Sequence, residues 1–547
     1  MAVPLLPQND PDTSRRRALL EDARSHYRYT YEALTPVATL AELPPAAHFD
    51  VRYNVLQLDT MSKIAANMAS VEAKDALEPF DDLREYEDFY PVLPKPSSLA
   101  NYRHDRSFGR QRVAGANPMV IRRVTEAEDL ALFDLSLARL TAVTGFDSAD
   151  AALASQRFFI ADYRGFARFP TGNHGGRPKW ISPAIALFYW RPAGITDRGG
   201  LAPVAIRLSP ELGSVTPLDG ARWQVAKVHV QVADANHHEM STHLGRAHLV
   251  LEPFAIATLR QLAPNHPLRA ILDPHLRFTL ARNALARETL IRQDGPVDRM
   301  LAGTLEASIG VAVEAACTWH FEDFKLPNEL KNRGVDDPDL LPDYPYRDDA
   351  LLLWKAIGDF TLAYARVIYD SPAMVAADTE LQAWIREIGA QDGGRTRGVP
   401  ASLATAEEVA AALQQIIFIS GPQHSAINFP QWDYIGAPVN MPFAAYASPF
   451  AAVDPAADIQ QALLPLLPPV DQVRDQIEVM RFLSGFRYDR LGSYAPNQFL
   501  DPRALATVRD FQAALHQAEM RIQNRNARRS EPYEYLLPSN VLNSASI

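Results

Sequence analysis

Two stretches of the chain, 348–369 and 508–528, carry apolar residues at intervals near three and four, with polar residues between them. This spacing places the apolar side chains on one face of an α-helix, so both stretches are predicted to be long helices. Two further apolar-rich stretches follow a Thr and a Glu at capping-box spacing, which predicts two more helices. They are 130–143 after Thr125 and Glu128, and 409–420 after Thr405 and Glu408.

Strand signals are sparse by comparison. Residues 158–163 and 204–208 are short, β-prone and bounded by turn formers. No repeat of 20 to 50 residues is visible, and the proline- and glycine-rich breaks at 91–98, 389–400 and 463–469 are too short for long tethers. The pattern predicts a mainly α fold with a small antiparallel β subregion.

Composition narrows the function classes. Lys and Arg number 54 against 65 Asp and Glu, a formal net charge of −11. Proteins that bind nucleic acids usually carry a basic surface that attracts the phosphate backbone. This chain is acidic, so no nucleic-acid partner is expected. Hydrophobic residues make up 47% of the sequence, which is enough for a large buried core.

Cysteine usage and hydropathy indicate the compartment. Cys317 is the single cysteine, which excludes an internal disulfide, a Cys-rich zinc site and a CxxCH haem attachment. The N-terminus lacks the apolar run of a signal peptide, and no stretch of 18 apolar residues is free of charge. We therefore expect a cytoplasmic protein without a membrane span, and peripheral contact with a membrane surface stays open.

Histidines are concentrated in one part of the chain. Seven of the 14 lie between residues 229 and 275, and imidazole is the commonest metal ligand. The segment from His238 does not form the HExxH motif of zinc peptidases, because Thr242 stands where the second histidine is needed. Instead His238, His243 and His248 are five residues apart. Such neighbours are about 140° apart on a regular α-helix, so chelation by any pair requires a wider, π-type turn.

A second candidate ligand group follows the helix predicted to end near residue 420. His424 and Asn428 are four residues apart, so one further helical turn would aim both side chains at one point. Taken alone, the segment would favour a polar pair on a surface turn.

The run HEMSTHLGRAH at 238–248 resembles the lipoxygenase iron-helix signature. The resemblance extends to the end of the chain through 252–254, 256–257, 260–262, 266–267, 274–279, 283–287, 343–346, 423–428, 532–538 and 543–547. It implies a large helical catalytic domain built around two long core helices. It also implies one domain over 1–547, in which about residues 1–120 form a helical and extended region, without a separate N-terminal β-barrel domain.

Carried over residue by residue, the resemblance implies one non-haem iron ion, with manganese as the lesser alternative. Its ligands would be His243, His248, His424, the side-chain oxygen of Asn428 and the terminal carboxylate of Ile547. Neutral imidazoles suit iron, and one anionic oxygen favours its ferric state. Ligation would also explain an ordered chain end, because chain ends are normally frayed.

The resemblance assigns further roles around the metal. Glu239 and Gln431 would belong to the hydrogen-bond network that orients the ligands. Ala286 falls at the family's Ala-or-Gly stereocontrol position, where alanine is associated with S products. Leu285, Leu290 and Val297 resemble pocket-lining positions. The arginines that some members place near Leu285 or at Met441 are missing, so the direction in which the substrate enters is undetermined.

The implied reaction is the addition of O2 to a polyunsaturated fatty acid of the linoleic or arachidonic type. An iron-bound hydroxide would take a hydrogen atom from the bis-allylic methylene of a cis,cis-1,4-pentadiene, and no catalytic side chain beyond that hydroxide is expected. The product is an S-hydroperoxide, and the protein is expected to be a monomer. Two alternatives are a hydroperoxide isomerase on the same fold and a lipid-binding protein without catalysis.

Overall fold

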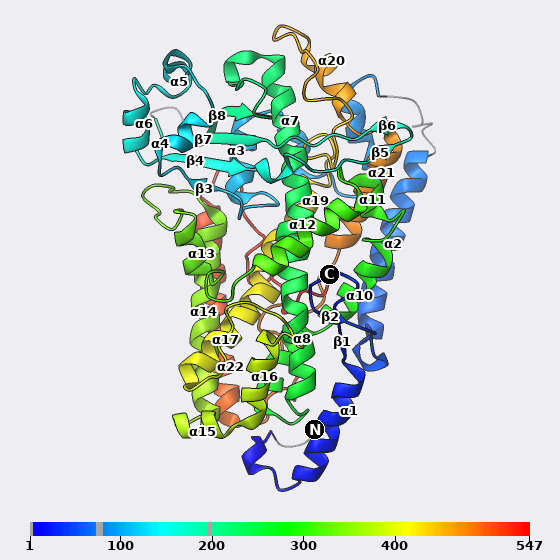
Figure 1. Ribbon diagram of the computed structural model, residues 1–547, viewed down its shortest axis with the longest axis vertical. Helices are drawn as coiled ribbons and strands as arrows, with labels where there is room; N and C mark the ends of the chain where they lie inside the picture. The colour runs from blue at the N-terminus through cyan, green and yellow to red at the C-terminus, as the bar shows by residue number, and fades with distance from the viewer. Residues whose placement is uncertain (1–3, 73–79, 195–198) are drawn as a thin grey trace.

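The structure is a computed structural model that describes residues 4–72, 80–194 and 199–547. It is elongated, with the long helices running roughly along its longest axis (Figure 1). The helices of ten or more residues are α1 Thr13–His26, α2 Val51–Glu72, α3 Asp105–Ala114, α7 Ala221–Asn236, α8 Val250–Gln261, α9 Pro267–Leu276, α10 Thr279–Thr289, α12 Leu305–Thr318, α14 Pro345–Ile368, α16 Thr379–Gly389, α17 Ala406–Phe418, α21 Val470–Ser484 and α22 Pro502–Asn526.

Shorter helices connect these elements. They are α4 Ala127–Ala131, α5 Leu137–Thr144, α6 Ala149–Ala154, α11 Pro296–Met300, α13 Leu326–Asn332, α15 Pro372–Ala377, α18 His424–Asn428, α19 Pro430–Tyr434 and α20 Ile459–Leu463. None of the helices in the described part of the chain combines the length and apolar character needed to cross a bilayer.

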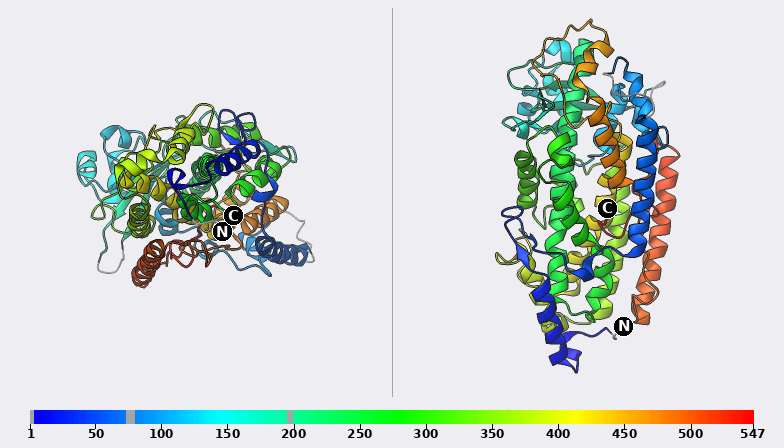
Figure 2. Two further views of the ribbon diagram at one scale, coloured as in Figure 1. Left: turned by 90° about the horizontal axis from the view of Figure 1, so that it is seen from below. Right: turned by 90° about the vertical axis from the view of Figure 1, so that its right-hand side faces the viewer.

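Two long composite helices run through the middle of the molecule, as predicted. In the first, α7 passes without a break through the π-helix η7 (His237–Leu249) into α8. In the second, α17 passes through the π-helix η8 (Ile419–Gln423) into α18. Helix α14 packs against α17 on one side and α22 on the other, whereas α2 lies on the opposite side of the core beside α21 (Figures 1 and 2).

A four-stranded antiparallel sheet lies at one end of the molecule, in the order β3–β4–β7–β8. Its strands are β3 Arg122–Arg123, β4 Phe158–Asp162, β7 Ile185–Arg191 and β8 Gly200–Arg207. Two-residue pairs elsewhere are β1 Tyr29–Thr30 with β2 Thr39–Leu40, and β5 Asn173–His174 with β6 Arg177–Pro178. The two strands predicted from sequence are confirmed as β4 and part of β8, while β7 was missed because it is nearly continuously apolar and buried.

The predicted helices in the later part of the chain are confirmed as α14, α17 and α22. The Thr405 side chain accepts a hydrogen bond from the Glu408 backbone N–H, and the Glu408 side chain completes the capping box. The single helix predicted over 130–143 is wrong. Asp134 adopts a left-handed φ of 46°, which a continuous helix does not allow, and Ser136 then caps a separate helix, α5. The Thr125 capping box does not form either, because α4 starts after Glu126 without a side-chain cap.

Candidate metal centre

The π-helix η7 brings two histidines of the candidate site onto one face. The Nε2 atoms of His243 and His248 lie 3.3 Å apart, although the residues are five positions apart in the sequence. The wider turn predicted from this spacing is therefore confirmed. His238, five residues earlier, is directed elsewhere: its Nε2 lies 2.9 Å from the carbonyl oxygen of Ile427.

His424 completes a group of three from the second composite helix. Its Nε2 lies 3.4 Å from Nε2 of His243, and the three buried imidazoles each offer a nitrogen to one common point. Two nitrogens that each bind one divalent ion at about 2.1 Å lie about 3.0 to 3.4 Å apart when they subtend 90° to 109° at the ion. The observed separations of the Nε2 atoms match that requirement.

The π-helix packs closely on its neighbour, α12. A Cβ atom added to Gly245, which lies between the two histidines of η7, would be 2.6 Å from the Cβ of Ala315. Glycine is thus the residue that lets the wide turn approach α12. Gly421 has a similar role in η8, where an added Cβ would be 2.8 Å from the carbonyl oxygen of Leu542 in the C-terminal tail.

Burial keeps the three imidazoles neutral. Desolvation lowers the pKa of His243, and it lowers the pKa values of His248 and His424 well below the ordinary value. The charge of Arg282, which lies in the wall of the same cavity, lowers all three further. Neutral imidazole is the form that binds a metal, so the site is ready for one without losing protons first.

A hydrogen bond also fixes the orientation of His248. Its Nδ1 lies 3.0 Å from the side-chain oxygen of Asn283, so Nδ1 carries the proton and Nε2 presents its lone pair to the common point. The amide nitrogen of Asn283 donates to a Glu252 carboxylate oxygen at 2.7 Å, and Arg287 binds the same carboxylate at 2.9 Å. Sequence reasoning missed Asn283, Glu252 and Arg287 as site residues, because nothing in their spacing separates this buried network from an ordinary ion pair between helices.

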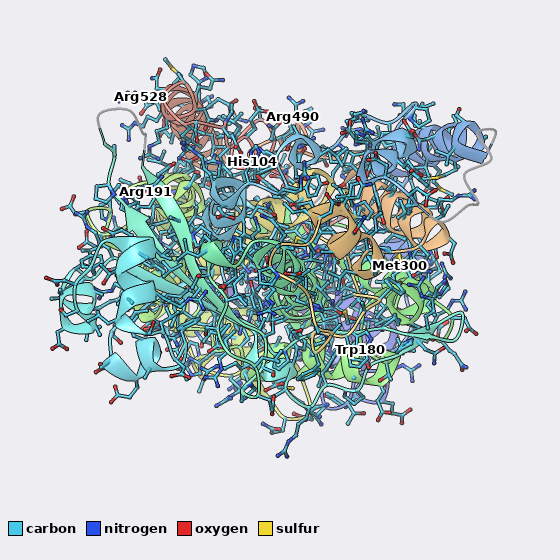
Figure 3. The ribbon with its side chains drawn as sticks, turned by 90° about the horizontal axis from the view of Figure 1, so that it is seen from above. His104, Trp180, Arg191, Met300, Arg490 and Arg528 are labelled. Atoms are coloured by element: carbon cyan, nitrogen blue, oxygen red, sulfur yellow. The ribbon has the colours of Figure 1, made fainter. Side chains whose placement is uncertain are left out.

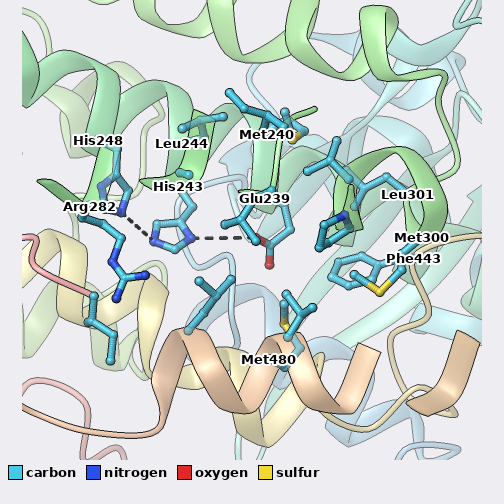
Figure 4. Close-up of a pocket in the computed structure, with 18 residues that line it drawn as sticks. Glu239, Met240, His243, Leu244, His248, Arg282, Met300, Leu301, Phe443 and Met480 are labelled. Carbon is cyan, nitrogen blue, oxygen red and sulfur yellow. Dashed lines mark hydrogen bonds and ion pairs between the residues drawn. The ribbon is translucent and has the colours of Figure 1, made fainter. Parts of the chain in front are cut away.

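Glu239 lies between two histidines of η7. One carboxylate oxygen is 3.2 Å from Nδ1 of His238. The other is 3.8 Å from Nδ1 of His243 (Figure 4). Burial opposes ionisation of Glu239, but its interactions with the two histidines outweigh burial and lower the pKa of the carboxyl group to about 2. A carboxylate at Nδ1 holds the His243 ring so that Nε2 faces the other two histidines.

Asn428 and Gln431 form a buried pair at the end of the second composite helix. The Gln431 amide donates to the side-chain oxygen of Asn428 at 2.9 Å, and the Asn428 amide donates to the carbonyl oxygen of Leu483 at 3.0 Å. These bonds fix the orientation of the Asn428 amide, whose oxygen accepts from Gln431 and keeps one further lone pair. The structure thus joins the two residues directly to each other.

The chain terminus lies inside the molecule rather than at its surface. Ile547 is 2% exposed and lines the same cavity as His243 and His248. A hydrogen bond with its backbone partly offsets the lowering of the His424 pKa by burial. The marked C-terminus lies near the middle of the long axis in Figures 1 and 2. The structure therefore places the terminal residue beside the three histidines.

An apolar cavity begins at the histidines. Its walls are almost entirely hydrocarbon (Figure 4), and its lining includes Met240, Leu244, Ala286, Leu290, Val297, Leu301, Phe443 and Met480. Three of the sequence-predicted pocket residues, Ala286, Leu290 and Val297, line it, whereas Leu285 does not. The cavity volume is about 80 Å³, and ligand pockets typically hold about 300 to 1,000 Å³. Side chains must therefore move to admit a long acyl chain.

A larger crevice of about 880 Å³ lies elsewhere and has a different character. Arginines line it, including Arg110 of α3, Arg525 of α22 and Arg528 just after α22. Figure 3 shows Arg528 on the side of the molecule away from Met300, which lines the apolar cavity. The crevice has a mixed lining, with Trp190, Pro192 and Leu201 beside the arginines, whereas the walls of the cavity at the histidines are almost entirely hydrocarbon. The cavity at the histidines is therefore the better site for an apolar ligand.

Three buried histidines that could hold one metal ion lie on two core helices with π-turns, at an apolar cavity, and this arrangement indicates the class of protein. The chain belongs to the lipoxygenase family, whose model matches residues 57–533. Lipoxygenases are dioxygenases, and the predicted family and fold class are thus confirmed.

Two curated relatives show the range of the family. The linoleate 9/13-lipoxygenase of Pseudomonas aeruginosa is 35% identical over 90% of this chain and 73% of its own length. The human hydroperoxide isomerase ALOXE3 is 32% identical over 81% of this chain and 62% of its own length.

Solved structures agree with the fold over the whole chain. A lipoxygenase deletion variant in complex with arachidonate matches with a TM-score of 0.91 at 27% identity, covering 100% of this chain and 84% of that one. The coral 8R-lipoxygenase matches with a TM-score of 0.90 at 28% identity, covering 100% and 83%.

Proposed function

We propose that this chain is a non-haem iron dioxygenase that adds O2 to polyunsaturated fatty acids containing a cis,cis-1,4-pentadiene and forms S-hydroperoxides. The observation that carries the proposal is the convergence of three imidazole Nε2 atoms at the end of an apolar cavity. A carrier of lipids would need the cavity but not the convergent, neutral histidines.

The iron ligands would be His243, His248, His424, the side-chain oxygen of Asn428 and the terminal carboxylate of Ile547. The fit is supported by the Nε2 separations and by the burial of all five residues. When bound there, iron supplies the one-electron chemistry that takes a hydrogen atom from the bis-allylic methylene. Manganese would suit the same donors less well than iron in this proposal, because imidazole-rich sites favour the later metals.

The protein's own contribution is to position the substrate and exclude water. The hydrocarbon walls formed by Leu244, Leu290, Val297 and Met480 bind the acyl chain along its length. The walls hold the pentadiene in one place, so that O2 adds to a defined carbon of the radical left after hydrogen removal. The relative that acts on linoleate and the structure with arachidonate both support a fatty acid as the substrate.

We propose S stereochemistry from Ala286. This residue lines the cavity near the histidines, on α10, where a methyl group restricts the space on one side of the pentadiene. Glycine at this position should open that space to O2. Ala286→Gly is therefore expected to raise the share of R product in chiral chromatography, with Ala284→Gly on the same helix as the control. An unchanged S-only product would remove Ala286 from this role.

The direct test measures metal and turnover together. Purified protein is analysed for iron and manganese and incubated with linoleic or arachidonic acid in aerated buffer, while conjugated-diene absorbance and oxygen uptake are followed. We expect diene formation matched by oxygen loss, in proportion to iron content. An iron-loaded sample that consumes neither acid would contradict the proposal.

A hydroperoxide isomerase is the second candidate, because the human relative with that name is 32% identical to this chain. The same samples decide between the two. An isomerase consumes added fatty-acid hydroperoxide without oxygen uptake and leaves the free fatty acid unchanged, whereas a dioxygenase does the opposite.

A further inference from the structure

The C-terminal tail lies in an aromatic cluster of its own, apart from the main core. The buried members of this cluster are Tyr53, Phe429, Phe486, Tyr488, Leu542 and Ile547. Tyr53 comes from α2, at the other end of the sequence, and its ring stacks on Phe49 with a centroid distance of 4.1 Å. The end of the chain is thus enclosed by residues that the mechanism above does not use.

The tail is held firmly up to Asn543. The amide of Asn543 donates to the carbonyl oxygen of Ser493 at 2.7 Å, and its side-chain oxygen accepts from the Gly492 backbone at 3.0 Å. The Leu542 backbone donates to Ser425 at 3.1 Å, which ties the tail to α18. These contacts leave four residues between the anchored asparagine and the terminal carboxylate.

Tyr53 holds the tail close to its end. Its phenol donates to the carbonyl oxygen of Ser546 at 2.6 Å, and the Tyr53 side chain is fully buried. The peptide group that follows this carbonyl carries Ile547. A hydrogen bond at that place limits rotation of the final residue and so limits where its carboxylate can lie.

Arg282 fixes the direction of that hydrogen bond. Its Nη2 lies 2.5 Å from the Tyr53 oxygen. Arginine has only donors, so the Tyr53 oxygen accepts from Arg282 and its hydroxyl proton must point to Ser546. Arg282 is 3% exposed and, within the part of the chain that the structure describes, forms no ion pair with a carboxylate. A buried cation without such a pair is costly, which favours a role for the group at this place.

We propose that Tyr53 is a positioning residue for the terminal carboxylate of Ile547, and that Arg282 acts through Tyr53. This inference rests on the proposed function, in which that carboxylate binds iron. A direct role for Arg282 in binding the substrate carboxylate fits less well. Arg282 lines the cavity at its histidine end, beside His248 (Figure 4), whereas the reacting methylene is many bonds from the acid group of the substrate.

The test compares two tyrosines of the same cluster. Tyr53→Phe removes the hydroxyl that binds Ser546 and keeps the ring. Tyr488→Phe is the matched control, because its hydroxyl donates to Asp50 rather than to the tail. Iron-loaded full-length variants are mixed with a chelator, the rate of iron loss is measured, and electron paramagnetic resonance of the oxidised protein reports the ligand field.

We expect Tyr53→Phe to lose iron about 10 to 100 times faster than wild type and to change the resonance spectrum, while Tyr488→Phe matches wild type. Arg282→Met should resemble Tyr53→Phe, and Arg282→Lys, which keeps a donor and a charge, should restore part of the difference. Equal rates and spectra for the two tyrosine variants would overturn the proposal.

A second measurement needs no metal. Carboxypeptidase is added to the metal-free proteins, and mass spectrometry follows the release of Ile547. Loss of one hydrogen bond at Ser546 should speed release about tenfold in Tyr53→Phe relative to Tyr488→Phe. A wild type that holds no iron would defeat the proposed function alone, whereas equal release rates would defeat the role of Tyr53.

Discussion

Five buried histidines of this protein fall into two groups that differ in what their ring nitrogens face. In His266 and His275, both nitrogens have protein partners. Nε2 of His266 binds Asp378 at 3.0 Å and its Nδ1 accepts from the Leu268 backbone, and His275 binds the carbonyl oxygen of Asn543 at 2.9 Å and the Tyr494 hydroxyl at 3.0 Å. These histidines tie elements together.

In His243, His248 and His424, the Nε2 atoms face each other instead. All five rings are buried, so burial does not separate a ligand from a structural histidine. The difference lies in lone pairs that the protein leaves without a donor and directs to one point.

The largest expected effect is loss of the metal from one group but not the other. His424→Ala should reduce bound iron to near zero and abolish diene formation, because it removes a donor that the other two cannot replace. His266→Asn should keep its iron and instead lower the free energy of unfolding by about 1 to 3 kcal/mol, because buried partners lose their hydrogen bonds. Elemental analysis and chemical denaturation measure both. Iron loss in both variants would contradict the division into metal-binding and structural histidines.

Acidification should lower the stability of the protein through buried histidines outside the three-histidine group. Burial lowers the pKa values of His229 and His275 to about 4, below the ordinary 6.5. Between these values the unfolded chain binds the extra protons, so this stabilisation is complete above pH 6.5 and is lost as the pH falls towards 4. Each histidine accounts for about 3 kcal/mol.

The measurement is denaturation of the metal-free protein from pH 7 to pH 4.5. The free energy of unfolding should fall less steeply with decreasing pH in His275→Gln, because this variant has one fewer titrating group. Stability that stays constant over this range would contradict the assignment.

A smaller effect is expected from the residue that orients His248. Asn283→Ala removes the acceptor for the Nδ1 proton of His248, so the imidazole ring of His248 can rotate and change tautomer. We expect iron affinity to fall about 10- to 100-fold, which competition with a chelator measures. Asn328→Ala is the control, because Asn328 is bonded only at the exposed surface. Unchanged affinity in Asn283→Ala would show that the ring is held by packing alone.

The smallest expected effect concerns the π-helix. The added methyl of Gly245→Ala would meet Ala315 at 2.6 Å, so we expect a loss of about 1 to 3 kcal/mol in the free energy of unfolding. Gly310→Ala, on the facing helix α12, meets nothing within 4 Å and should stabilise by about 0.5 to 1 kcal/mol. Thermal denaturation of both variants checks the pair. A stable Gly245→Ala with normal iron would show that η7 can move away from α12.

Much of the helical framework was predictable, because it depends on local pattern. Amphipathic spacing and the Thr405 capping box located α14, α17 and α22. The prediction over 130–143 was wrong because a single left-handed residue, Asp134, interrupts an otherwise suitable apolar run. Strand β7 was missed because a fully buried strand has no alternation of polar and apolar residues.

The sequence by itself determined the family, the wide turn between His243 and His248, and the set of candidate ligands, because each depends on residue type and short spacing. Only the tertiary structure decided which groups meet across the molecule. It placed His424 beside His243, joined Asn283 to His248, and enclosed Ile547 with Tyr53. Such long-range contacts depend on how distant helices pack and on which buried polar atoms remain unpaired. A local sequence pattern predicts neither of these.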